Sequence, residues 1–115
     1  MDVPSFIAQW RKYATANLNH AALEQKRGSP FGADLALARG EVRQAAAELL
    51  QKSLSDPVQA AKHMHERAKA SWQHTLPLIG FDEAALKYTR ARTWQDCARA
   101  IDPSLPVVQP QLMTE

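Results

Sequence analysis

Several features common in secreted, membrane and metal-binding proteins are missing from this 115-residue sequence. A single cysteine, Cys97, excludes an internal disulfide and any metal site built from several thiolates. No apolar run is long enough to cross a bilayer. The first ten residues lack the basic start and apolar stretch of a signal peptide. These absences favour a cytoplasmic protein.

A strong charge of either sign is also missing. The 14 basic and 12 acidic residues are interspersed and leave a formal net charge of +2. That balance is too even to require nucleic acid or an anionic membrane as the partner. Arginine outnumbers lysine and alanine is abundant, a composition typical of GC-rich bacterial genomes.

Large aliphatic residues are scarce for a chain of this length, which on size forms one domain. Leucine, isoleucine, valine and phenylalanine together occupy 23 positions, whereas alanine alone occupies 20. Such a fraction lies near the level at which folding alone becomes marginal. A thin, alanine-lined core suits close helix–helix packing, and it gains stability from a partner or from self-association.

Helical periodicity runs through most of the chain. The first predicted helix covers residues 4–27, and the loop 28–32 follows it. A second apolar stripe then continues to Leu50. Gly40 lies within that stripe at a cost of about 1 kcal/mol relative to alanine, which indicates either a close approach by another helix or a frayed helix start.

Two further helices are predicted from their start signals. Asp56 and Pro57 suit the cap and first position of a third helix that ends near residue 75, before Pro77. Asp82 and Glu83 open a fourth helix, which continues to Ile101 with a break expected near Thr93, where the sequence resembles a capping box.

The expected architecture is therefore all-α, a small antiparallel bundle of about four helices in residues 1–102. No strand pattern and no internal repeat is visible. Three prolines, Pro103, Pro106 and Pro110, mark residues 103–115 as an extended or flexible C-terminal tail.

Three of the four histidines lie within the predicted third helix. With 100° per residue, His65 falls on the apolar face, whereas His63, Arg67 and His74 point outward. His63 and His65 point away from each other, and His63 and His74 lie about 16 Å apart along the helix axis, too far to share one ion. We therefore predict no metal site and no cofactor, with His65 either buried and hydrogen-bonded or at a helix–helix seam.

A nucleic-acid partner remains an alternative rather than the favoured one. The outward side of the third helix has a modest basic surface, made by Lys62, His63, Arg67, Lys69 and His74. Glu66 interrupts it. The segment 93–112 loosely follows a helix-turn-helix pattern, but its prolines would break the recognition helix. A small DNA-associated regulator that uses this basic face is thus a second hypothesis.

Catalytic chemistry has little support in the sequence. Cys97 lies beside Trp94 and Ile101 on an apolar helix face, where a free cysteine is usually a small core residue. The loop 28–32 lacks the strand and lysine of a phosphate-binding loop. No two catalytic groups can be placed facing each other, so we expect no enzymatic activity.

The segment from Ala33 to Gln73 resembles the granule-coating phasins. It shares their amphipathic helices rich in alanine, glutamine and leucine, and an Asp-Pro helix start at residues 56–57. The resemblance covers about a third of the chain, and the tryptophan-rich remainder departs from it. It implies an amphipathic coat on an apolar surface, and it assigns no role to any single residue.

The favoured hypothesis is a non-enzymatic helical protein-interaction module, a small bacterial adaptor, chaperone or accessory protein that self-associates or binds one protein partner. Aromatic and arginine side chains are the usual anchors of such interfaces. The candidate contact residues are Trp10, Tyr13, His63, Arg67, His74, Val107 and Val108. We expect removal of residues 103–115 to weaken association without unfolding the bundle.

Overall fold

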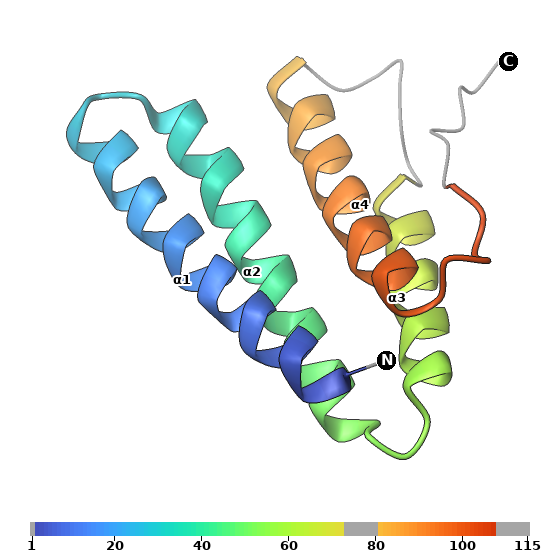
Figure 1. Ribbon diagram of the computed structural model, residues 1–115. Helices are drawn as coiled ribbons and strands as arrows, with labels where there is room; N and C mark the ends of the chain where they lie inside the picture. The colour runs from blue at the N-terminus through green and yellow to red at the C-terminus, as the bar shows by residue number, and fades with distance from the viewer. Residues whose placement is uncertain (1, 73–80, 108–115) are drawn as a thin grey trace, which may run out of the picture.

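The computed structural model describes residues 2–72 and 81–107, and α-helices hold most of them (Figure 1). The helices are α1 (Val3–Lys26), α2 (Pro30–Lys52), α3 (Pro57–Trp72) and α4 (Phe81–Ile101). No strand occurs in these two ranges, so the all-α prediction is confirmed. Of the helices described, none combines the length and the apolar character needed to cross a membrane.

The first two helices begin and end at local signals. The Asp2 side chain accepts hydrogen bonds from the backbone N–H and the hydroxyl of Ser5, at 3.4 and 2.5 Å, and these bonds lower the pKa of that carboxyl. Gly28 ends the first hairpin turn with φ +77°, which glycine adopts without strain. The loop is shorter than predicted, because Pro30 already occupies the first turn of α2.

The third and fourth helices follow their predicted starts, but α4 has no break. Asp56 caps α3 by accepting a hydrogen bond from the Gln59 backbone N–H at 3.1 Å. The predicted end near residue 75 lies outside the described residues. The break expected at Thr93 is wrong: its buried hydroxyl donates to the Thr89 carbonyl at 2.7 Å, one turn back within a continuous helix.

The four helices form two antiparallel hairpins that meet along α2 and α4. α1 packs mainly on α2, and α3 packs mainly on α4. Figure 1 shows the turn between α1 and α2 standing well apart from the start of α4. The molecule measures 41 × 40 × 18 Å, and its radius of gyration of 14.8 Å exceeds the roughly 13 Å of a compact domain this long. The bundle is therefore flat and splayed.

The core is built mostly from small side chains. Eleven of its twenty buried apolar residues are alanines. The largest fully buried side chains are Leu50, Met64 and Ile101, and the buried indoles of Trp10 and Trp94 belong to the same cluster. This composition brings the helix backbones close together and leaves little large apolar area to stabilise the fold.

Gly40 lies at such a close approach of two helices, which was one of the two alternatives predicted for it. A Cβ atom at this position would lie 3.2 Å from the Ala14 carbonyl oxygen, the Asn17 Cβ and the Leu18 Cδ2 of α1. Because Gly40 lies ten residues into α2, the alternative of a frayed helix start is wrong.

The core face of α3 is rotated away from the predicted one. Ala60 and Met64 are buried, whereas His65, which was placed on the apolar face, is only half-buried and its Nδ1 has no hydrogen-bond partner. Leu18 and Tyr88 are 37% and 49% exposed. After α4, residues 102–105 make a turn, and Leu105 packs against the core.

Candidate interaction surfaces

The α1–α2 hairpin has an exposed outer face that no other described element covers. Spacings of three and four residues align its side chains along the two antiparallel helices. We call this surface the seam face, and its exposed members are Ala8, Arg11, Thr15 and Leu18 on α1 and Leu37, Glu41, Gln44, Glu48 and Gln51 on α2.

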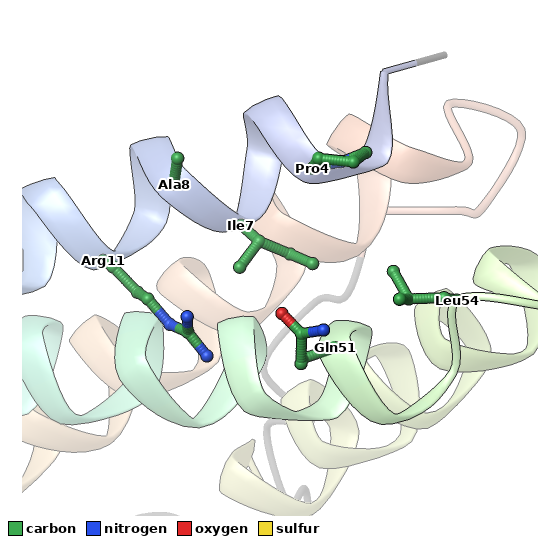
Figure 2. Close-up of a pocket in the computed structure, with 6 residues that line it drawn as sticks. All are labelled: Pro4, Ile7, Ala8, Arg11, Gln51 and Leu54. Atoms are coloured by element: carbon green, nitrogen blue, oxygen red, sulfur yellow. The ribbon is translucent and has the colours of Figure 1, made fainter.

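A recess of about 250 Å³ lies at one end of the seam face (Figure 2). Buried Ile7 forms its floor, between Pro4 and Ala8 on α1 and Leu54 just after α2. Figure 2 shows the Arg11 side chain reaching toward α2 and the Gln51 amide pointing back toward α1. The volume is below the roughly 300–1,000 Å³ of small-molecule sites, so the recess suits a single side chain of a partner.

A second recess of about 220 Å³ adjoins the first and shares Arg11. Ala14 and Thr15 line it on α1, and Gln44 and Glu48 line it on α2. Arg11 and Glu48 both lie exposed at this recess, and neither forms an ion pair within the described ranges. The middle of the seam face therefore carries one unpaired charge of each sign.

Apolar side chains lie at both ends of this charged middle. Leu54, at the recess of Figure 2, is 50% exposed. At the other end, Leu18 contacts the backbone position of Gly40, and exposed Leu37 is one turn away on α2. The seam face thus runs from an apolar end through a charged middle to a second end, where Glu41 lies beside the two leucines.

The two candidate aromatics of α1 lie elsewhere. Trp10 is 5% exposed, with its ring 5.9 Å from that of Phe6, and so presents almost no surface to a partner in this fold. Tyr13 is 43% exposed but two residues from Arg11, and therefore points to nearly the opposite side of α1. Its hydroxyl accepts a hydrogen bond from Gln9 at 3.0 Å.

Arg43 of α2 fixes the position of Tyr13. Its guanidinium lies 5.5 Å from the centre of the Tyr13 ring, and its Nη1 donates to Asn17 Oδ1 at 2.5 Å. These contacts join α1 to α2 on the side away from the seam face. Tyr13 therefore has a structural role in the hairpin, in addition to its exposed edge.

The predicted basic face of α3 is partly engaged with α4. His63 is exposed, with its Nε2 3.5 Å from Gln59 Nε2. Arg67 lies over the Trp94 ring, 5.3 Å from its centre, and Lys69 pairs with Glu66 at 3.4 Å. His74 and Val108 lie outside the described residues. Val107 is 47% exposed just after the turn that follows α4.

The α3–α4 hairpin carries a second exposed aromatic group. Tyr88 meets Trp72 edge to face at 5.6 Å between ring centres. Its hydroxyl accepts a hydrogen bond from Arg92, whose Nε also binds Asp96 at 3.2 Å and whose pKa is raised, chiefly by that aspartate. The spacing of four residues between these three side chains is visible in the sequence.

Cys97 and the histidines were the candidates for reactive or metal-binding groups in the sequence. Cys97 is 5% exposed, and burial raises the pKa of its thiol to about 12, so the nucleophilic thiolate is scarce at neutral pH. No group of three His, Cys, Asp or Glu side chains in residues 2–72 and 81–107 is placed to hold a metal ion. His65 is half-buried, and its buried Nδ1 has no hydrogen-bond partner.

Comparison with protein families, curated proteins and solved structures found no match to this chain. The similarity of residues 33–73 to phasins is thus one of composition and helix pattern. Functional inference rests on the surfaces described above, and the seam face was not among the predicted sites. A second heptad-like stripe on the first helix, at positions 8, 11, 15 and 18, is the sequence signal that would have revealed it.

Proposed function

We propose that this protein is a non-enzymatic helical interaction module that binds another protein chain, which includes a second copy of itself. The seam face is the observation that supports this function. It combines exposed leucines, a side-chain-sized recess and unpaired charges on two long helices held together by close backbone contact.

The arrangement of these groups is more informative than their number. Isolated exposed leucines are normal on protein surfaces. Here Leu18 and Leu37 lie on the same face as the recess at Ile7 and Leu54, with polar side chains between and around them. Protein–protein interfaces share this anatomy, in which apolar contacts are surrounded by polar groups at the rim.

The alternatives have weaker support. The DNA-associated regulator needs a free basic face on α3, but Arg67 lies against Trp94 and Lys69 is paired with Glu66. The phasin-like coat rests on the sequence pattern of residues 33–73. A cytoplasmic location and a bacterial origin are likewise proposals from composition.

The test compares association of the wild-type chain with that of two matched variants. Leu18→Gln/Leu37→Gln removes the exposed leucines of the seam face, and Leu23→Gln removes a leucine that is 48% exposed on another side of α1. Each protein is measured by light scattering over a concentration series, and as immobilised bait for affinity capture from a bacterial lysate. We expect wild type and Leu23→Gln to associate with themselves or a captured protein, and the double variant to lose that association.

Two results would reject the proposal. Association that is equal in all three proteins would show that the seam face is not the binding surface. Absence of both self-association and capture in the wild type would remove the interaction function itself. Co-eluting nucleic acid that salt removes would instead favour the DNA-associated regulator.

A further inference from the structure

We propose that the seam face binds a second copy of this chain, in a two-fold dimer that places α1 of each copy over α2 of the other. This inference rests on the proposed interaction function and specifies its partner. The argument has three parts, which are the order of side chains along the face, the pairing of its charges and its area.

The seam face consists of three layers across the two helices. Ala8 and Leu54 line the same recess at one end, and Arg11 and Glu48 line the same recess in the middle. At the other end, Leu18 lies against the position of Gly40, and Leu37 lies one turn before Gly40 on α2. Each layer therefore takes one member from α1 and the other from α2 or from the residues directly after it.

A two-fold axis parallel to the hairpin matches these layers with themselves. Such an axis keeps every layer at its own height and exchanges the two helices between copies. Leu18 then meets Leu37 of the second copy, and Ala8 meets Leu54 at the recess. Arg11 meets Glu48 of the second copy, and the symmetry forms this pair twice.

An axis across the helices would give a poorer match. It would reverse the layers and place α1 on α1 and α2 on α2, so that an axis through the middle layer sets Arg11 against Arg11 and Glu48 against Glu48. Because Arg11 and Glu48 form no ion pair within residues 2–72 and 81–107, the first arrangement satisfies them and the second does not. The charge pattern thus selects the orientation as well as the partner.

The face has the area of a weak, reversible dimer interface. Its members on α2 run from Leu37 to Gln51, a span of about 21 Å at 1.5 Å per residue, and two adjacent helices are about 20 Å wide. The seam face is therefore on the order of 400 Å² per copy. Standard protein–protein interfaces bury about 800 Å² per partner, and transient ones bury less.

A charge-reversal experiment tests this geometry directly. In Arg11→Glu, both intermolecular pairs become Glu opposite Glu, and in Glu48→Arg both become Arg opposite Arg. We expect each variant to self-associate about tenfold more weakly than wild type in sedimentation velocity. Mixed in equal amounts, the two variants should form a heterodimer with near wild-type affinity, because both of its pairs are then attractive.

The mixing result separates contacts between chains from contacts within one chain. Each variant still carries two like charges in its own recess, so pairing within a chain cannot restore the heterodimer. Lys12→Glu is the matched control, with the same charge change on the neighbouring position of α1, outside both recesses of the seam face. We expect it to dimerise as wild type does, and thermal melts of all variants confirm that each is folded.

The outcomes distinguish this inference from the broader proposal. A wild-type dimer whose affinity is unchanged by the reversals, or is not recovered on mixing, overturns the two-fold seam dimer and leaves the interaction function standing. A wild type that remains monomeric at the highest attainable concentration also overturns the dimer. The affinity capture described above then decides the interaction function separately.

Discussion

The two hairpins bury similar cores but differ in how much leucine they leave exposed. The first buries Ile7, Trp10, Val42 and Leu50 beside its alanines, and the second buries Met64, Trp72, Trp94 and Ile101. Among the described residues, the large apolar side chains exposed on the second hairpin are Val58 and Tyr88, whereas four leucines in the first hairpin, or directly after it, are 37–50% exposed. Burying a leucine side chain contributes about 1.5–3 kcal/mol. The exposed leucines of the first hairpin would contribute such free energy only when another surface covers them.

The largest expected effect comes from the buried aromatic anchor of the second hairpin. Trp94→Ala removes a 7% exposed indole and its contact with Arg67, and should lower the free energy of unfolding by about 3–5 kcal/mol. Leu37→Ala in the first hairpin should change it by less than about 0.5 kcal/mol in dilute solution. Urea denaturation measures both. Equal losses in the two variants would contradict the contrast between the hairpins.

The close contact within the first hairpin should be the next most sensitive point. Gly40→Val places two methyl groups against the Ala14 carbonyl and Asn17, where even a Cβ would lie at 3.2 Å. Forcing the helices apart should cost about 1–3 kcal/mol. The same valine side chain at an exposed helix position, in Ala100→Val, should cost much less. Thermal or urea unfolding measures the stability of both variants. If the two were equally stable, the close α1–α2 contact at Gly40 would be contradicted.

Two C-terminal truncations test how much the residues after α4 contribute to stability. Removing residues 103–115 also removes Leu105, which is partly buried against the core, so it should lower the free energy of unfolding by about 1 kcal/mol. This truncation therefore cuts through a packed turn. Removing residues 108–115 should leave the unfolding free energy within about 0.5 kcal/mol of wild type. If both truncations unfold alike in urea, Leu105 does not contribute to the core.

The smallest expected effect on stability is that of alkaline pH on buried Cys97, which belongs to the core cluster shared by the two hairpins. Folding raises the pKa of Cys97 from an ordinary value of 9.0 to about 12. The stability contributed by the neutral buried thiol is thus fully present below pH 9 and is lost progressively between pH 9 and 12. At pH 10 the free energy of unfolding should fall by roughly 1 kcal/mol. Cys97→Ala should lose this part of the pH dependence in urea titrations at pH 8 and 10, and an unchanged slope would contradict the assignment.

Local signals explain why most of the fold was predictable. Asp56 and Pro57 act on their own helix start, and Gly28 acts on its own turn, so each can be interpreted without knowing what packs nearby. The break expected at Thr93 failed for the opposite reason. A capping-box pattern and a helix interior offer the same hydroxyl different partners, and burial of Thr93 against the bundle selects the helix.

The candidate site was less predictable because it depends on which helix faces are already occupied. Leu18 and Trp10 both fit apolar stripes on α1, yet only Trp10 reaches the core, since α2 approaches at Gly40 and displaces Leu18 outward. The same geometry leaves Arg11 and Glu48 at one recess although they are far apart in sequence. Their proximity follows from helix pairing, which the spacing within either helix cannot reveal.

Because all three indoles are buried, intrinsic tryptophan fluorescence reports whether the hairpins remain packed together. Trp10, Trp72 and Trp94 are 5%, 8% and 7% exposed, and none is a member of the seam face. Dimerisation through that face should therefore leave the intrinsic fluorescence spectrum unchanged, while separation of the hairpins should shift its maximum to the red. Emission and hydrodynamic size would then follow two different events in the same sample.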